Sequence, residues 1–323
     1  MKSVVITEFG SAKVLSLESR ESLCPQDSEV VIDVKAAGVN RADIMQRLGQ
    51  YPAPPGVPAD VPGLEVAGVI SAIGKGVTSF RVGDSVCALL SGGGYSEQAV
   101  AHARECLPIP KNLSFIEAAC LPEAICTVWH NVFELGALQA GETLLVHGGS
   151  SGIGVHAIML ASALGSSVIV TVGSREKGEA CLKLGAKKYI LYKEEKFEDV
   201  LKDEQVNVVL DMVGGDYLMR NLKIIATGGR IVHINAMNGR KAEVDILQIM
   251  KKRVTITGST IRARDHQFKA DLIQAIFKNV WPLIEAGKVH PIINADFTLA
   301  QASLAHELME SGQHIGKIVL TND

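Results

Sequence analysis

Hydrophobic and polar positions follow two different rhythms along the chain, and the change falls near residue 121. Before that point, short apolar runs are separated by glycine and proline, which is typical of short β-strands. The strand-like runs are VVIT, EVVIDVKAAGV, EVAGVISAIG, DSVCALL and SEQAVAHA. An amphipathic stretch at 40–49 (NRADIMQRLG) predicts a helix. The proline-rich segment 51–63 that follows it predicts a surface loop, either a plain connector or a wall of a substrate cleft.

From residue 121 onward, apolar runs alternate with helical stretches. The six runs are TLLVHG, SSVIVTV, KKYILY, NVVLDMV, GRIVHIN and VTITGS. The helical stretches between them are 153–164, 175–184, 195–202, 216–226 and 244–251. This alternation predicts βαβ units and a parallel sheet that is covered on both faces. Right-handed crossovers then give a doubly wound dinucleotide-binding fold of two halves.

The last part of the chain predicts a long helix at 268–287, a strand at 290–297, an amphipathic helix at 299–311 and a final strand at 315–320. Two helices and two strands are too few to fold alone, so we expect them to complete the N-terminal domain. The predicted organisation is a strand-rich domain formed by residues 1–121 plus 266–323. An α/β domain formed by residues 122–265 is inserted into it.

Composition narrows the class without naming a function. The chain has 323 residues, 47% hydrophobic residues, 21% charged residues and a net charge of −3, so it reads as a globular protein for which no nucleic-acid partner is expected. No uninterrupted apolar run reaches about 18 residues, so no membrane span is predicted. The N-terminus does not read as a signal peptide, and the six cysteines form no C-x-x-C pair. Reduced thiols and a cytoplasmic location are therefore expected.

The segment TLLVHGGSSGIGVHA at 143–157 combines a strand, a glycine-rich turn and the start of a helix. Gly149 permits the tight turn, Gly152 lets the backbone approach a pyrophosphate, and Gly154 lets the helix pack on the strand. The amino end of the helix offers free N–H groups and positive potential to a phosphate. The predicted phosphate-binding residues are Gly149, Ser150, Ser151, Gly152, Ile153 and Gly154.

The end of the second strand of this unit indicates which dinucleotide binds. NAD-binding proteins usually carry an acidic residue there to bond the ribose 2′-hydroxyl. Here Gly173 and Ser174 take that place, and Arg175 and Lys177 follow. Both cations could be ordinary residues of a first helical turn. Cations at a helix amino end oppose its dipole, however, so a bound 2′-phosphate gives them a reason to be there, and the prediction is NADPH.

A set of motifs in a fixed order resembles a known family. The motifs are AGVNRADIMQRLGQY, PGLEVAGVI, VGDSVCALLSGGGYSEQ, LPEAICTVWH, HGGSSGIG and IGKIVL. They are similar to the zinc-free NADPH:quinone oxidoreductase branch of the medium-chain dehydrogenase/reductase superfamily, and within it to the p53-inducible quinone oxidoreductase group. The resemblance covers essentially the whole chain. It implies an α/β fold class in which a GroES-like, strand-rich catalytic domain carries an inserted, doubly wound Rossmann domain.

The zinc-dependent members of that superfamily bind a catalytic metal through residues that are replaced here. Asn40 takes the place of a cysteine ligand, and Leu64 takes the place of a histidine ligand. Neither side chain can replace a thiolate or an imidazole on zinc, so no metal is predicted. Cys120 and Cys126 are predicted to be buried apolar thiols. Without a Lewis acid an alcohol is hard to oxidise, whereas a quinone accepts hydride readily.

The resemblance also implies roles for individual residues. Asn40 would lie beside the nicotinamide or the acceptor. Tyr51 would line the quinone pocket unless it only packs in its loop, and Thr127 would lie near the cofactor unless it only bonds its own helix. Further cofactor contacts would come from Ser174, Lys177, Tyr192, Gly214, Met237, Asn238, Ile261 and Arg262. His314 and the G-S-S-G loop depart from the family pattern. His147 and His233 end strands at the cofactor side and could line the cleft, but a hydrogen-bonded structural role is expected for both.

These observations predict an NADPH:quinone oxidoreductase whose proton comes from water or Tyr51. Its substrate would be a small-molecule quinone. Two alternatives stay open: an enoyl thioester reductase of the same superfamily, and an NADPH-binding protein without a catalytic role. The last of the six strands, VTITGST, would leave an exposed sheet edge, and in the family two such edges pair. A homodimer through this sixth strand is therefore expected.

Overall fold

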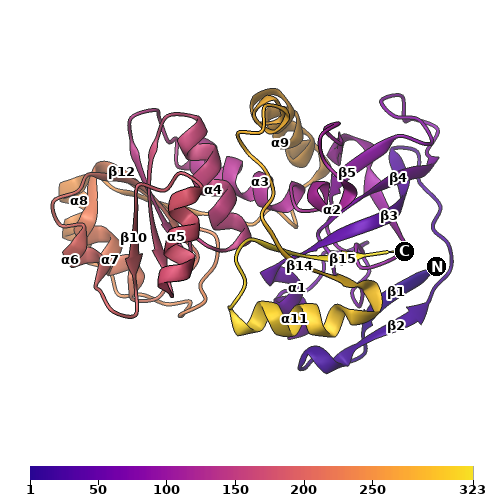
Figure 1. Cartoon of the computed structure of the whole chain (residues 1–323), viewed down its shortest axis with the longest axis horizontal. Coiled ribbons are helices and arrows are strands. Elements are labelled where there is room, and N and C mark those ends of the chain that lie inside the picture. Colours follow the sequence, from indigo (N-terminus) through magenta and orange to yellow (C-terminus); the bar gives the residue numbers. More distant parts are fainter. Residues whose placement is uncertain (323) are drawn as a thin grey trace. The chain divides into compact units, whose positions relative to one another are not determined.

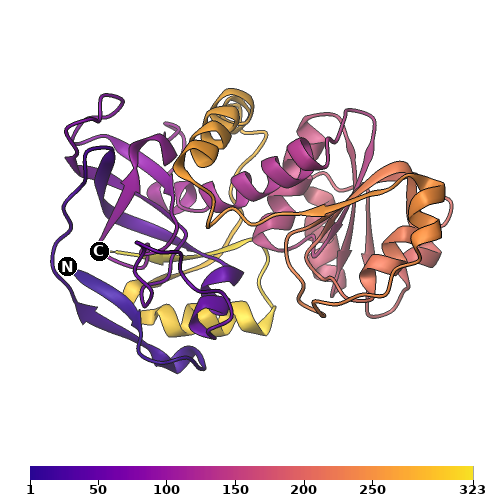
Figure 2. The ribbon, with the colours of Figure 1, turned by 180° about the vertical axis from the view of Figure 1, so that it is seen from behind.

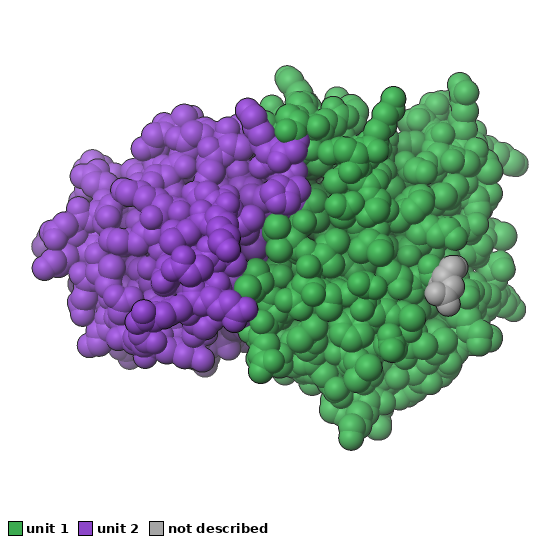
Figure 3. Space-filling view, viewed as in Figure 1, with its two compact units in different colours: residues 1–126, 261–286, 291–323 green, residues 127–260, 287–290 purple. Residues whose placement is uncertain are grey.

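The computed structural model describes residues 1–322, which fall into two compact units. Unit 1 comprises Met1–Cys126, Ile261–Ala286 and Pro291–Asp323, and unit 2 comprises Thr127–Thr260 and Gly287–His290 (Figure 3). The last part of the chain thus returns to the unit formed by the N-terminal residues. No helix within the described residues is long and apolar enough to cross a membrane.

Unit 2 is built on a sheet of six parallel strands. The strands lie in the order β10-β9-β8-β11-β12-β13, in which the first strand of the unit is central and the order reverses beside it. Their bounds are β8 Thr143–His147, β9 Ser167–Val172, β10 Lys188–Leu191, β11 Val206–Asp211, β12 Ile225–His233 and β13 Thr255–Gly258. The predicted doubly wound fold is confirmed.

Helices cover both faces of this sheet (Figures 1 and 2). They are α4 Gly152–Ala163, α5 Arg175–Lys183, α6 Phe197–Val200, α7 Tyr217–Ile224 and α8 Ile246–Lys252, and the π-helix η3 Trp129–Leu135 also belongs to unit 2. Because both faces are covered, the strands are apolar almost throughout: Leu145, Ile169 and Val209 are fully buried. β12 starts at Ile225, earlier than the predicted run at 229, because Ile225 already pairs with Val206 before a register shift.

Unit 1 is built on a sheet in the order β14-β15-β3-β4-β5-β7, in which β6 also pairs with β3. The bounds are β3 Glu29–Val39, β4 Glu65–Ile73, β5 Ser85–Leu89, β6 Gln98–His102, β7 Cys106–Pro108, β14 Ile293–Thr298 and β15 Lys317–Thr321. β1 Lys2–Ile6 and β2 Leu15–Ser19 form a separate hairpin pair. β15 runs antiparallel to β3 and pairs Ile318 with Val39, so the end of the chain completes the sheet of its beginning (Figure 1).

The helical segments of unit 1 are short except for two near its end. Their bounds are η1 Ala12–Val14, α1 Arg41–Arg47, η2 Ala103–Glu105, α2 Phe115–Ala118, α9 His266–Asn279, α10 Trp281–Glu285, η4 Leu299–Gln301 and α11 Ala302–Ser311, and α3 Pro122–Val128 runs from unit 1 into unit 2. The prediction of one long helix at 268–287 is wrong, because the chain forms α9 and then α10. Pro282 has no N–H to donate to the preceding turn, and its ring would clash with the carbonyl of Lys278.

Candidate active-site residues

The glycine turn between β8 and α4 has the form that a phosphate needs. A Cβ on Gly154 would clash with the carbonyl oxygen of Gly149 and lie 2.5 Å from that of Gly148, and a Cβ on Gly149 would lie 2.5 Å from Cβ of Val170. Both positions therefore require glycine. The Ser151 hydroxyl caps α4 by accepting the N–H of Gly154 at 3.0 Å. The twelve-residue helix directs its amino end at the turn, so these residues fit a pyrophosphate.

The end of β9 offers hydroxyl and amine groups. Ser174 caps α5 by accepting the N–H of Lys177 at 3.4 Å, and burial lowers the pKa of the Lys177 amine. Arg175 and the one acidic residue of this turn, Glu176, are exposed. A Cβ on Gly173 would lie 2.9 Å from the hydroxyl oxygen of Tyr192, so Gly173 leaves the room in which that hydroxyl lies.

The next predicted cofactor residues follow β11 and β12. Gly214 has a φ of +69° and donates its N–H to Oδ1 of Asp211 at 3.0 Å. The Asn238 side chain donates to Asp216 at 3.1 Å, and Met237 is 58% exposed. The carboxyl ends of parallel strands share one edge of the sheet, so all the predicted cofactor residues of unit 2 that follow β8 to β12 gather at that edge. Their role as cofactor contacts stays a prediction.

A buried polar network under this edge was not apparent in the sequence. His147 bonds Thr171 at 3.1 Å and Asn221 at 2.8 Å, and Asn221 donates to Asp211 at 3.0 Å. Burial lowers the pKa of His147, and the Asp211 carboxylate offsets only part of that effect. The imidazole is therefore neutral at physiological pH, and the expected structural role of His147 is confirmed.

In unit 1, Asn40 is held by a buried ion pair. Its amide Nδ2 donates to Oε1 of Glu65 at 2.9 Å, and its Oδ1 accepts from Nζ of Lys317 at 2.6 Å. Lys317 also donates to Glu65, and all three side chains are buried. The amide orientation of Asn40 is thus fixed from two sides. The sequence signal that could have revealed this ion pair is a single charged residue near the start of each of two apolar runs: Glu65 in GLEVAGV and Lys317 in GKIVL.

Tyr51 and Arg262, far apart in the chain, come together in unit 1. Arg262 donates from Nη1 to the Tyr51 carbonyl at 3.2 Å, from Nη2 to Gln46 at 2.6 Å and from Nε to the Ser91 carbonyl at 2.7 Å. Its guanidinium carbon lies 5.3 Å from the centroid of the Tyr51 ring. Arg262, which the resemblance implied as a cofactor contact, and the neighbouring Ile261 are both buried. In this structure Arg262 fastens the Tyr51 loop, a role that sequence reasoning missed.

Thr127 lies in α3 at the beginning of unit 2. Its carbonyl oxygen accepts a hydrogen bond from the Asn131 side chain at 2.9 Å, where the helix continues as η3. Asn131 in turn accepts from the Ser259 hydroxyl at 2.8 Å. The role of Thr127 near a cofactor stays a prediction.

The six cysteines are free thiols, and every one except Cys24 is buried. Burial raises the pKa of both Cys120 and Cys126, and nearby carboxylates add to the shift at each. These two residues are apolar core thiols, as the sequence predicted.

A cluster of possible metal ligands lies elsewhere in unit 1. Ligand atoms of His102, Glu105 and His266 lie within 4.8 Å of one another. Nδ1 of His102 already accepts the N–H of Arg104 at 3.2 Å, and Nδ1 of His266 bonds Oε1 of Glu105 at 2.6 Å. We interpret Glu105 and His266 as an ion pair that links η2 to α9. The 161-residue separation between Glu105 and His266 explains why no spacing motif revealed it.

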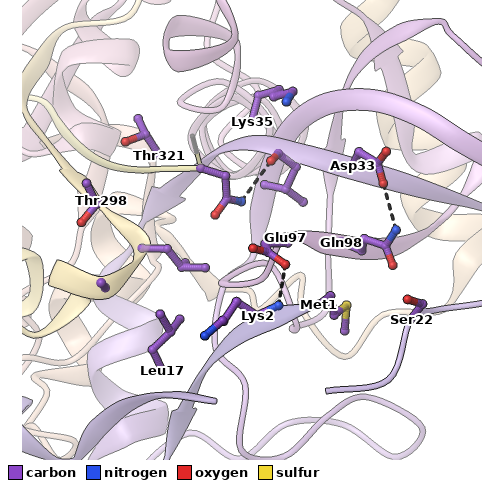
Figure 4. Close-up of a pocket in the computed structure, with 14 residues that line it drawn as sticks. Met1, Lys2, Leu17, Ser22, Asp33, Lys35, Glu97, Gln98, Thr298 and Thr321 are labelled. Carbon is purple, nitrogen blue, oxygen red and sulfur yellow. Dashed lines mark hydrogen bonds between the residues drawn. The ribbon is translucent and has the colours of Figure 1, made fainter. Parts of the chain in front are cut away.

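A hollow of about 620 Å³ in unit 1 is separate from the predicted site residues. Strands β1, β2, β3, β6 and β15 contribute to its wall (Figure 4). Its polar groups bond one another: the Lys2 N–H donates to Glu97 at 2.6 Å, and Gln98 donates to Asp33 at 3.0 Å. None of the residues predicted to bind cofactor or acceptor lines it.

A doubly wound sheet with a phosphate-fitting turn, combined with a strand-rich unit that both ends of the chain build, defines the architecture of a dinucleotide-dependent dehydrogenase or reductase. Two known sequence families agree with it. Residues 26–111 match the alcohol dehydrogenase GroES-like domain, and residues 184–320 match the zinc-binding dehydrogenase family. The rat (Rattus norvegicus) quinone oxidoreductase is 33% identical over 99% of this chain and 97% of that protein, and the mouse (Mus musculus) quinone oxidoreductase gives the same values. The chain belongs to the medium-chain dehydrogenase/reductase superfamily.

Solved structures extend the comparison. The Escherichia coli quinone oxidoreductase complexed with NADPH is 27% identical, with a TM-score of 0.90 over all of both chains. An NAD-dependent alcohol dehydrogenase is 28% identical, with a TM-score of 0.89 over all of both chains. The CurK enoyl reductase is 27% identical, with a TM-score of 0.87 over 99% of this chain and 98% of that one.

Proposed function

We propose that this protein is an NADPH-dependent oxidoreductase that reduces a quinone. The observation that carries the proposal is the glycine turn at the amino end of α4, together with Ser174 and Lys177 at the end of β9 where an NAD-binding protein would carry an acid. The NADPH bound to the similar Escherichia coli enzyme supports the same cofactor.

NADPH, when bound, supplies the hydride. In this proposal the turn from Gly149 to Gly154 holds the pyrophosphate on backbone N–H groups. Ser174, Arg175 and Lys177 hold the 2′-phosphate, and Tyr192 lies beside the adenine. The remaining predicted contacts are Gly214, Met237, Asn238, Ile261 and Arg262.

The acceptor would bind beside Asn40 and Tyr51. Both residues are hydrogen-bonded to neighbouring side chains. Glu65 and Lys317 bond the Asn40 amide, and Arg262 bonds the Tyr51 carbonyl. Residues fixed in this way can position an acceptor. Because Asn40 and Leu64 are not zinc ligands, we propose that the reaction runs without a metal, which suits a quinone better than an alcohol.

The decisive experiment follows the loss of NADPH and NADH absorbance with an ortho-quinone, a para-quinone and an enoyl thioester supplied separately. We expect turnover with quinones, a preference for NADPH and no effect of a chelator. Turnover restricted to the thioester would move the function to enoyl reduction. Tight NADPH binding without reduction of any acceptor would favour a non-catalytic role.

Enoyl reduction is the second candidate because the CurK enoyl reductase is similar to this chain over nearly its whole length. The thioester arm of the experiment separates the two functions.

The cofactor preference gives a sharper test at Ser174. A Ser174→Asp substitution keeps a helix-capping side chain but places a carboxylate where the 2′-phosphate would bind. We expect the ratio of kcat/KM for NADPH to that for NADH to fall at least about tenfold, which corresponds to about 1.4 kcal/mol of repulsion.

The control is Ser114→Asp, since the Ser114 hydroxyl also accepts a backbone N–H, that of Glu117, at the amino end of a helix in unit 1. It should leave the cofactor preference unchanged. An unaltered preference in the Ser174→Asp variant would contradict the assignment of the 2′-phosphate site.

We also propose a homodimer and a cytoplasmic location. β13 lies at the end of the unit 2 sheet, and its outer edge pairs with no strand of the described residues. A second copy of β13 would cover that edge. Light scattering should then give twice the 34.4 kDa of one chain. The buried reduced thiols fit a reducing compartment.

A further inference from the structure

Glu123 is a carboxyl group that none of the assignments above uses. It lies in the first turn of α3, and its backbone N–H donates to Oε2 of Glu65 at 2.9 Å. That bond attaches it to the cluster in which the other carboxylate oxygen of Glu65 binds Asn40 and Lys317. The Glu123 side chain is only partly buried, and its own carboxyl oxygens show no hydrogen bond to another described residue.

The surroundings of Glu123 favour its protonated form. Burial raises the pKa of Glu123 to about 7, and the nearby Glu65 carboxylate adds to the increase. The Asp43 carboxyl group raises the pKa of Glu123 as well, and Lys317 and Lys269 lower it only in part. A carboxyl group with a pKa near neutrality suits a role in which it gives up a proton and regains it.

Glu123 also lies within electrostatic reach of the predicted acceptor residue Tyr51. Burial raises the pKa of Tyr51, and the charge of Glu123 raises it further. Glu123 likewise acts on Arg262, which fastens the Tyr51 loop. The backbone of Glu123 is thus anchored to Glu65, the residue that also holds Asn40, and the charge of its carboxyl group acts on Tyr51.

We propose that Glu123 is the general acid that protonates the reduced acceptor. The inference rests on the proposed quinone reduction. Hydride transfer oxidises NADPH and adds two electrons and one hydrogen to the quinone, leaving one oxygen as a phenolate. The O–H bond of Glu123 then breaks and a new O–H bond forms on the phenolate, which gives the hydroquinone and a Glu123 carboxylate. A proton from water restores the acid.

Other acids of unit 1 fit this role less well. The pKa of Asp43 is raised by burial to about 6, but its oxygens accept from the Asn40 N–H, the Gly63 N–H and the Tyr95 hydroxyl, and the side chain is fully buried. Tyr51 is a weak acid whose pKa is raised further, so it gives up a proton less readily than Glu123.

The test compares the pH dependence of quinone reduction in the wild type and in Glu123→Gln. The acid must be protonated to act, so the wild-type kcat should fall as the pH rises through about 7. Glu123→Gln should lose this dependence, and its kcat at pH 6 should be about tenfold lower. This loss is smaller than the roughly 10²–10⁴ typical of a general acid because water can also protonate a phenolate. Glu123→Asp should restore part of the pH dependence.

Glu117→Gln is the matched control, because Glu117 is a capping residue of α2 near Glu123 in the chain and glutamine can also serve in a capping box. It should keep the wild-type profile. A second readout needs no turnover: the infrared difference spectrum of the cofactor-free protein between pH 5 and pH 9 should lose a protonated-carboxyl band in Glu123→Gln. The NADPH affinity of this variant should match that of the wild type.

The outcomes separate this inference from the proposed function. A wild type that reduces quinones, together with a Glu123→Gln variant that keeps both the pH dependence and the infrared band, would overturn the role of Glu123 and leave the function standing. A wild type that binds NADPH and reduces no quinone would overturn both.

Discussion

The Gly154→Val variant should bind NADPH at least about 100-fold more weakly than the wild type, a loss of about 2.7 kcal/mol. The new Cβ would press against the carbonyl groups of Gly148 and Gly149, and backbone atoms cannot move aside as a flexible side chain can. The turn must therefore open. Its N–H groups would then leave the positions in which they bind a phosphate, and each such charge-assisted hydrogen bond contributes about 1.5–3 kcal/mol. A fluorescence titration with NADPH measures the affinity.

Gly141→Ala is a suitable control in the same unit. Gly141 has a φ of +84°, so alanine strains the backbone, but a Cβ there meets nothing within 4 Å. This variant should keep the NADPH affinity within about twofold, since ordinary strain in a turn costs only about 1 kcal/mol of stability and leaves the folded site intact. If the Gly154→Val variant binds NADPH as tightly as the wild type, the glycine turn is not part of the cofactor site.

The Lys317→Met variant should lose about 3–5 kcal/mol of the free energy of unfolding, because it leaves the buried Glu65 carboxylate without its partner. Burial lowers the pKa of Lys317, but the Glu65 carboxylate and other neighbours outweigh it, so the net pKa is raised and the amine stays charged. Glu65 itself has no exposed surface. Urea denaturation monitored by circular dichroism measures the loss.

Two further variants show whether the buried charge causes the loss. In the double variant Lys317→Met/Glu65→Gln the remaining group is neutral, so most of the lost stability should return. Lys188→Met breaks a partly exposed pair with Glu204 at 3.5 Å, and it should cost less than about 1 kcal/mol. A Lys317→Met variant as stable as Lys188→Met would mean that the buried pair contributes little.

The fold follows closely from the sequence in unit 2 and less closely in unit 1. Continuous apolar runs such as VVL in β11 have to lie in the covered interior of a parallel sheet, and the helices between them follow from the crossover rule. In unit 1, β7 has three residues and β2 is mostly exposed, so neither leaves an apolar pattern. The break before α10 was encoded locally by Pro282, but the apolar periodicity on both sides of it hid the stop.

The residues of the candidate site also fall into those that the sequence predicts and those that only the tertiary structure reveals. The sequence by itself determined the glycine turn and the Ser174–Lys177 segment, because their geometry depends on residues a few positions apart and on the ends of adjacent elements. Only the tertiary structure decided that Lys317 holds Asn40, that Arg262 fastens Tyr51, and that Glu123 lies beside Glu65. These pairs are 277, 211 and 58 residues apart. Burial and the charges around a group set its hydrogen bonds and its pKa, and both arise only when distant segments pack together.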